Sequence, residues 1–176
     1  MALRRRLYRA KSKYSGQALR LPFLGEFPVS FSFGAIPESE ELKQKYREWG
    51  MVGHNGIDYG LPEGTSVLAA AGGKVIQAGE KPDFGNLVII QHRWGQSWYG
   101  HLREVRKSVG DRVKAGSLIG LSGNSGFTFG RPHLHFAVKP NDSNVTNGYL
   151  GFIDPGQYFR QSKRKIPTTG AERKNS

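Results

Sequence analysis

The sequence predicts an all-β protein with one short helix, and three observations lead to this fold class. The 176 residues include 24 glycines, about twice the ordinary share of roughly 7%. Short segments rich in β-branched and aromatic residues recur between Gly, Pro and Asn, as in sandwiches and barrels. Only one segment, residues 37–49, has the pattern of a helix. The length suits a single domain with its own hydrophobic core.

Taken in order, the first predicted strand lies within residues 27–33, where Phe, Val, Phe and Phe alternate with other residues. The helix follows, because Pro37 and acidic residues come first, basic residues later, and Gly50 closes the segment. Residues 108–120 resemble the turn-and-strand unit of biotinyl-type and lipoyl-type barrels, which concerns the fold alone. The remaining predicted strands are residues 66–71, 74–78, 86–92, 97–102, 112–113, 117–121 and 133–139.

The charges divide the chain into three parts. Residues 1–20 carry seven basic residues and no acidic one, and residues 160–176 carry six basic residues and one acidic one. Between them, 13 basic residues balance 13 acidic ones. We therefore expect basic tails at 1–22 and 160–176 around a neutral folded domain at 23–159. The neutral middle argues against a nucleic-acid-binding function, which needs a basic folded surface; the tails are either solubilising or contacts for polyanions.

The composition also limits the cofactor and the location of the protein. Without cysteine, disulfide scaffolds, thiolate zinc sites and thiol nucleophiles are excluded, and a metal would need His, Asp or Glu ligands. No apolar segment approaches the length of a membrane-spanning helix, which is about 18–20 residues. No transmembrane segment is therefore expected. The basic first 16 residues are followed by no apolar segment, so they do not read as a secretory signal.

Four of the five histidines lie in settings that suggest a site. His133 and His135 are two apart on a predicted strand and therefore share one face; they form a metal or catalytic pair, or an ordinary exposed face. Glycines surround His54 and Asp58, and a tight turn there would bring imidazole and carboxylate together. The alternative is a hairpin in which Asp58 caps a backbone amide. His101 ends a predicted strand, where it is either functional or bonded to a carbonyl.

Together these residues can supply a hydrolytic metal site. Two histidines and one aspartate give the three N/O ligands that such a zinc site needs, with one position open for water. Zinc lowers the pKa of that water to about 7, and a further histidine could take its proton or stabilise an oxyanion. The sequence has no His-Glu-x-x-His segment, so a histidine would have to act as the base. His92 is given no function.

An ordered series of motifs resembles the LytM/lysostaphin-type zinc metallopeptidases, which cut the peptide part of bacterial peptidoglycan. The likeness runs from about Phe27 to Phe159. The motifs are His54-Asn55-Gly56-Ile57-Asp58, Gly85-Asn86-Leu87-Val88-Ile89-Ile90-Gln91-His92, Tyr99-Gly100-His101-Leu102, Gly123-Asn124-Ser125-Gly126 and Pro132-His133-Leu134-His135-Phe136. The fold that the resemblance implies is the duplicated hybrid motif, a β-sheet groove with one zinc ion on its floor.

The resemblance also implies roles for individual residues. It makes His54, Asp58 and His135 the zinc ligands, and His101 and His133 the catalytic pair that handles the proton and the oxyanion, without deciding which of them is the base. The implied function is a zinc-dependent endopeptidase that hydrolyses peptide bonds in peptidoglycan cross-bridges or stems, outside the cytoplasm. The alternative is a non-catalytic relative that binds the cell wall or activates an amidase. Because all five positions are filled, the enzyme is favoured.

Two departures from the family pattern lead to further expectations. Relatives often have an arginine and a short link before the first ligand, whereas this chain has Ala35-Ile36 and the predicted helix. We expect this helix to border the groove and to influence which substrate is accepted. No wall-binding domain is apparent, and the basic tails could take its place by contacting anionic wall polymers.

Overall fold

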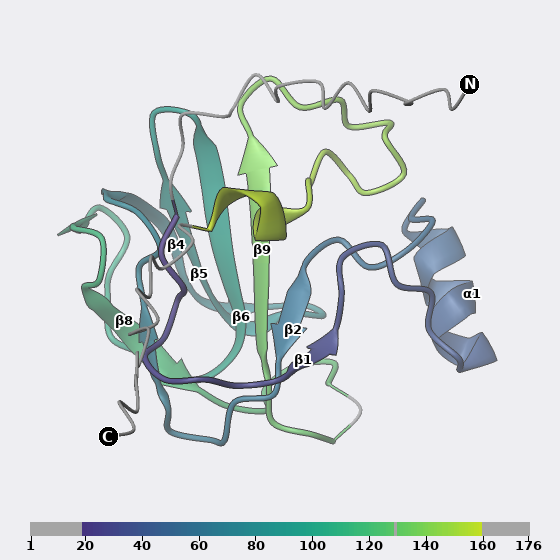
Figure 1. The fold of residues 1–176 in the computed structure, drawn as a ribbon, viewed down its shortest axis with the longest axis horizontal. Helices are drawn as coiled ribbons and strands as arrows, with labels where there is room; N and C mark the ends of the chain where they lie inside the picture. Colours follow the sequence, from purple (N-terminus) through teal and green to yellow (C-terminus); the bar gives the residue numbers. More distant parts are fainter. Residues whose placement is uncertain (1–18, 129, 160–176) are drawn as a thin grey trace, which may run out of the picture.

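The computed structural model describes residues 19–128 and 130–159 of the chain, and its order of elements confirms the predicted all-β class. The expected C-terminal tail and residues 1–18 of the expected N-terminal tail lie outside the described residues. Figure 1 shows a large antiparallel sheet with one α-helix to its side. The elements are β1 (Val29–Phe31), α1 (Glu40–Glu48), β2 (Ile57–Tyr59), β3 (Ser66–Leu68), β4 (Gly73–Lys81), β5 (Gly85–Gln91), β6 (Gly95–Val105), β7 (Arg112–Val113), β8 (Leu118–Ser122), β9 (Leu134–Pro140) and the 3₁₀ helix η1 (Pro155–Tyr158).

The nine strands pair in the order β1-β2-β9-β6-β5-β4-β7, and β8 pairs with both β3 and β6. The eleven residues of β6 make it the longest strand. It pairs with β5 and β9 along its first part and with β8 near its end. An extra residue on β6 interrupts the pairing with β5, since Tyr99 lies opposite Val88 but Leu102 lies opposite Asn86. This β-bulge contains His101 and turns the strand from one partner toward the next.

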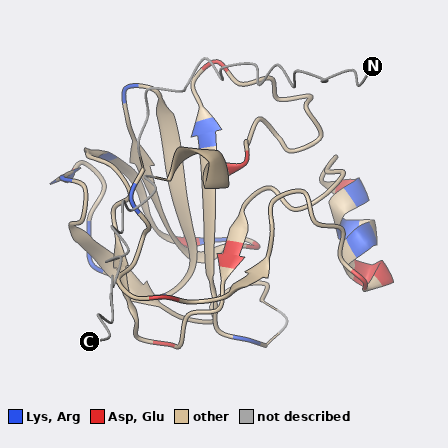
Figure 2. Cartoon of the chain, in the orientation of Figure 1, with Lys and Arg blue, Asp and Glu red and all other residues tan. Residues whose placement is uncertain are grey.

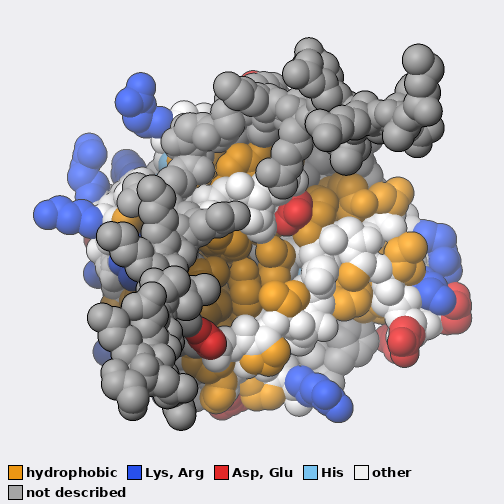
Figure 3. All heavy atoms as spheres, viewed as in Figure 1, with side chains coloured by type: hydrophobic (Ala, Val, Ile, Leu, Met, Phe, Trp, Pro, Cys, Tyr) orange, Lys and Arg blue, Asp and Glu red, His pale blue; other side chains and the backbone are white. Residues whose placement is uncertain are grey.

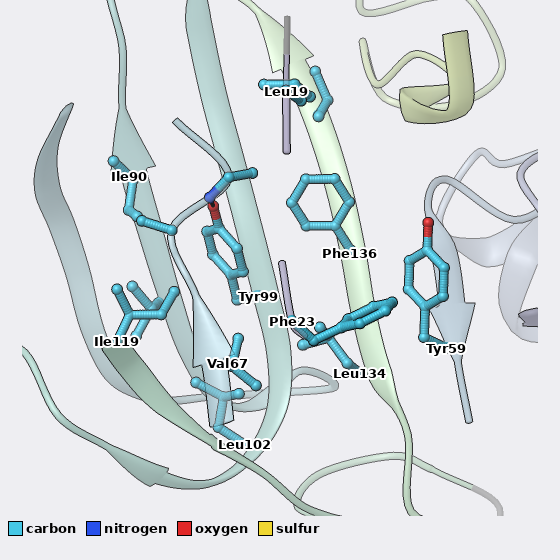
Figure 4. Close-up of a cluster of buried hydrophobic side chains, with 14 of the residues drawn as sticks. Leu19, Phe23, Tyr59, Val67, Ile90, Tyr99, Leu102, Ile119, Leu134 and Phe136 are labelled. Carbon is cyan, nitrogen blue, oxygen red and sulfur yellow. Dashed lines mark hydrogen bonds between the residues drawn. The ribbon is translucent and has the colours of Figure 1, made fainter. Parts of the chain in front are cut away.

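The hydrophobic core lies on the inside of the curved sheet. Tyr99, Phe136 and Leu134 are wholly buried there, and Figure 4 shows them in one cluster with Val67 and Ile119 from other strands. Leu19 and Phe23 precede the first strand but belong to the same core. Leu19 also donates its backbone N–H to the carbonyl of Tyr158, at 2.8 Å, which ties the two ends of the described chain together.

The helix α1 forms where the sequence predicts it and packs through a cluster of its own. The hydroxyl of Ser39 accepts a hydrogen bond from the backbone N–H of Leu42 and caps the helix. Acidic residues in the first turn and basic residues in the last suit the helix dipole, and Figure 2 shows these charges along its ribbon. Leu42, Tyr46 and Met51 are buried together, apart from the main core.

Two short strands differ from the expectation. The alternation over residues 27–33 yields only β1, because the chain turns at Gly34, whose φ of +76° favours glycine. Gly34 then donates its N–H to the carbonyl of His54 at 2.8 Å instead of continuing the strand. The segment expected as a tight turn around residue 56 continues into β2, which lies between β1 and β9. Its three residues are too few for an alternation pattern to predict.

The face drawn in Figure 3 separates basic from hydrophobic side chains. On the face drawn in Figure 3, Lys and Arg side chains stand at the edges while hydrophobic side chains gather in the middle. Among the described residues, no helix is long and apolar enough to span a membrane.

Candidate metal centre and cleft

Three donor groups meet where β2 lies beside β9. Asp58 on β2 is directly opposite His135 on β9, and His54 comes from the turn just before β2. The His135 Nδ1 and Asp58 Oδ1 atoms are 2.9 Å apart, and His54 Nε2 lies 3.2 Å from the same oxygen. The two ring nitrogens are 3.1 Å from each other. The three donors therefore form a nearly equilateral triangle.

This triangle fits a tetrahedral zinc ion. Zinc–nitrogen distances of about 2.0–2.1 Å place neighbouring ligands of a tetrahedron about 3.3 Å apart. Both imidazoles are buried, with exposures of 5% for His54 and 4% for His135. His54 Nδ1 faces the carbonyl of Ser32 at 3.2 Å, which turns Nε2 toward the centre, as the outer hydrogen bond of a metal-binding histidine does. The residues present therefore suit the metal that the sequence predicts.

The turn before β2 has no room for a side chain at position 56, which is glycine. A Cβ atom at this position would lie 2.6 Å from Cε1 of His135 and 2.8 Å from the carbonyl oxygen of Phe136. Such separations are far inside van der Waals contact, so any side chain here would displace the imidazole. The turn can approach β9 only because residue 56 has no side chain.

The charges of the three donors also suit a cation. Burial alone would raise the pKa of Asp58, but its hydrogen bonds with His135 and His54 hold it well below its usual range. Burial lowers the pKa of His135, against the opposing effect of Asp58. The site therefore favours an ionised carboxylate and neutral His135, the protonation states in which these groups bind metals.

His101 and His133 lie beside the donor triangle, with ring centroids 4.6 Å apart. Each directs Nδ1 at a backbone carbonyl: His101 at Ser125 O, 2.8 Å away, and His133 at Arg131 O, 2.9 Å away. In the neutral rings these nitrogens carry the proton, so Nε2 is left as a proton acceptor. His133 Nε2 lies 3.8 Å from Asp58 Oδ2. Burial lowers the pKa of His101 to about 3, which keeps this ring neutral.

The structure thus brings together all five residues that the sequence predicts for the site. The fifth histidine, His92, lies elsewhere and bonds the carbonyl of Gly72 and the hydroxyl of Ser97, both at 2.8 Å. Sequence reasoning gave no role to the residues whose carbonyls orient the imidazoles, Ser32, Ser125 and Arg131, because a backbone acceptor leaves no signal in residue type. It also missed Phe84, whose ring centroid lies 5.5 Å from that of His135.

A cleft of about 930 Å³ opens over these residues. The donor triangle and both remaining histidines line one part of it, and Leu42, Tyr46 and Trp49 of the α1 segment line another. The expectation that the helix borders the groove is therefore confirmed. Burial and the charge of Asp58 raise the pKa of Tyr46, so this phenol stays neutral beside the donors. Such a centre, with proton acceptors at its side and an accessible cleft, can activate water for hydrolysis.

Comparison with known proteins agrees with this class of site. Residues 52–147, more than half of the chain, match Peptidase family M23, and the chain belongs to this family. The glycyl-glycine endopeptidase ALE-1 of Staphylococcus capitis is 36% identical over 122 residues, which are 66% of this chain and 33% of the relative. The chain spans between a fifth and a third of the length of the curated relatives it matches.

Solved structures show the same likeness. The catalytic domain of lysostaphin from Staphylococcus simulans has a TM-score of 0.60 and 30% identity, covering 74% of this chain and 90% of that one. A zinc-containing peptidase from Vibrio cholerae has a TM-score of 0.63 and 28% identity, covering 78% of this chain and 39% of that one. The family and the donor triangle together confirm the expected zinc cofactor.

Proposed function

We propose that the protein is a zinc-dependent metalloendopeptidase that hydrolyses peptide bonds in the cross-bridges or stems of bacterial peptidoglycan. The observation that carries this proposal is the triangle of His54, Asp58 and His135 with two further imidazoles beside it, all lining one cleft. Support for the substrate comes from relatives named as glycyl-glycine endopeptidase and peptidoglycan DD-endopeptidase. The non-catalytic alternative is not favoured, because none of the five positions is lost.

The mechanism follows from the positions of the side chains. His54 Nε2, Asp58 Oδ1 and His135 Nδ1 would hold the zinc ion, which polarises the scissile carbonyl and lowers the pKa of a bound water to about 7. One of His101 and His133 takes the proton of the attacking water at Nε2 and passes it to the leaving amine nitrogen. The other takes a second proton, from solvent, at Nε2 and donates this Nε2–H to the carbonyl oxygen as negative charge develops there.

Mass spectrometry of purified peptidoglycan incubated with the zinc-loaded protein tests this proposal. New amine and carboxyl termini that disappear when a zinc chelator is added support it, and their masses name the bond that is cut. Intact peptidoglycan after incubation with the folded, zinc-loaded protein, across several wall chemistries, contradicts it and favours the non-catalytic alternative.

The location and a second contact belong to the same proposal. Peptidoglycan lies outside the cytoplasmic membrane, so the protein would act in the cell wall or periplasm. We further propose that the basic tails contact anionic wall polymers. A shallow pocket at the β4–β7 edge, lined by Lys74, Arg93, Arg112 and Lys114, would add to the attraction, which salt screens. Unchanged binding to isolated sacculi at low salt after removal of both tails would contradict the tail contact.

A further inference from the structure

Ser125 is joined to His101 and to the strands on both sides of it. Its carbonyl accepts a hydrogen bond from His101 Nδ1 at 2.8 Å. Its hydroxyl donates to the carbonyl of Leu102, the next residue of β6, at 2.7 Å. The same hydroxyl accepts from the backbone N–H of Asn86 on β5, at 2.9 Å. One short side chain therefore bonds two strands at the place where the catalytic imidazole leaves the sheet.

The backbone around Ser125 is also pressed against β5. A Cβ atom at Gly85 would overlap Ser125, and one at Gly126 would overlap Gly85. Both glycines have positive φ, +59° and +75°, which other residues adopt at a cost. The Asn86 side chain links β5 to β6 directly by donating to the same Leu102 carbonyl, at 3.1 Å. The loop after β8 is thus held against β5 by contact as well as by hydrogen bonds.

His101 needs such support because the sheet does not fix its direction. It lies in the bulge of β6 with φ of +61°, a left-handed conformation that is uncommon outside glycine. Its backbone N–H is bonded outside the strand ladder, to the carbonyl of Phe84 at 2.8 Å. The ring position is therefore set by the bond from Nδ1 to Ser125, which also leaves Nε2 free of a proton.

We propose that Ser125 is the positioning residue of His101: its carbonyl fixes the ring and the tautomer, and its hydroxyl holds that carbonyl in place against β5 and β6. The proposal rests on the catalytic role given to His101 in the proposed function. Replacing the side chain leaves the carbonyl present but removes the two bonds that fix it. Small displacements of a catalytic group cost as much as 100-fold in rate.

The experiment compares Ser125→Ala with Ser122→Ala in the full, zinc-loaded chain. Ser122 is a matched control because its buried hydroxyl also donates to a carbonyl, that of Pro62 at 2.6 Å, and also accepts from a backbone N–H, that of Thr65 at 3.0 Å. Ser125→Ala is expected to lower kcat about 10- to 100-fold with KM nearly unchanged. Ser122→Ala is expected to keep kcat, and Ser125→Thr, which retains the hydroxyl, is expected to restore it.

A second readout does not depend on activity. The nitrogen-15 spectrum of the histidine rings is expected to show one His101 tautomer, with a slowly exchanging Nδ1 proton, in the wild type and in Ser122→Ala. In Ser125→Ala this proton exchanges faster and the tautomers mix. If the alanine variant does not fold, Ser125→Cys replaces the hydroxyl with a weaker donor and is expected to show the same changes in smaller measure.

Equal losses of kcat in Ser125→Ala and Ser122→Ala would reduce Ser125 to a structural residue and overturn the proposal. An unchanged His101 ring spectrum in the folded Ser125→Ala variant would do so as well. Failure of the proposed function can be told apart from failure of the Ser125 proposal. In that case the wild type would cut no peptidoglycan, and the ring spectra would still test whether Ser125 positions His101.

Discussion

At the scale of single residues, the geometry of the site depends on one glycine as well as on the proposed ligands. Replacing Gly56 with alanine would push a methyl group against His135, whose Cε1 would be 2.6 Å away. We expect Gly56→Ala to bind less than one zinc ion per chain, measured by metal analysis after dialysis. Gly60→Ala is the matched control, since its Cβ would meet its nearest neighbour, Pro28, at an ordinary 3.5 Å. Full zinc occupancy in Gly56→Ala would contradict this account of the turn.

The two imidazoles outside the triangle give a second prediction. His101→Ala and His133→Ala each remove one Nε2 acceptor without removing a proposed ligand. We expect each to lower kcat about 100- to 10,000-fold while one zinc ion per chain stays bound, measured by peptide release and metal analysis together. Val109→Ala, at a residue that is 63% exposed, serves as a control with unchanged kcat. Loss of zinc from either variant would assign that histidine to metal binding instead.

Much of the site could be predicted from the sequence, but not its supports. The residues of the site have distinctive side chains at fixed spacing, as in His54 to Asp58 and His133 to His135, so their pattern carries chemical meaning. The groups that orient them act through backbone carbonyls, as Ser32 does for His54. Whether a carbonyl lies opposite a particular imidazole depends on tertiary structure, which residue type does not encode.

At the scale of elements, a series of buried polar side chains links the residue after β5 to β6, and it predicts that the stability of the fold depends on pH. His92 bonds Ser97 at 2.8 Å, and the Ser97 hydroxyl bonds that of Tyr99 at 2.9 Å. Burial lowers the pKa of His92 from 6.5, against the raising effect of the Gly72 carbonyl. The folded protein therefore binds this proton less readily than the unfolded chain does. The contribution of neutral His92 to the stability of the fold is complete above about pH 6.5 and is lost as the pH falls below that value.

We expect His92→Gln to destabilise the protein more at pH 8 than at pH 5, measured by urea unfolding. The pH dependence of the difference between wild type and variant isolates His92, because both proteins share the other histidines. This difference changes by at most about 1.4 kcal/mol per pH unit. A constant difference between pH 5 and pH 8 would mean that burial does not disfavour the charged form of His92.

The elements also differ in how far the sequence predicts them. The strands β5 and β9 bury nearly continuous apolar residues, and the capping pattern of α1 is local, so these elements can be predicted from the sequence. The short strands β1 and β2 owe their existence to pairing with partners far along the chain; β2 pairs with β9 through Asp58 and His135. Local patterns cannot report such pairing, and the sequence therefore predicts only a turn at β2.

At the scale of the whole molecule, the metal is expected to stabilise the fold. The proposed ligands come from the turn before β2, from β2 and from β9, and β9 is far from the other two in the sequence. An ion bound only by the folded state adds to its stability. Free zinc at 100 times its dissociation constant adds about 2.7 kcal/mol, which raises Tm by about 5–10 °C in a protein of this size. Calorimetry with and without a chelator measures this shift. His54→Ala is expected to show little of it, and an equal shift in that variant would place the stabilising zinc elsewhere.

The separate packing of α1 has a consequence for protein engineering. Leu42, Tyr46 and Met51 form their own cluster, so the main core does not depend on them. The same segment nevertheless supplies one wall of the cleft. Residues 37–50 can therefore be randomised or grafted from another sequence with little cost to the sheet that holds the five site residues. Libraries confined to this segment would vary one wall of the cleft while leaving the five site residues in place.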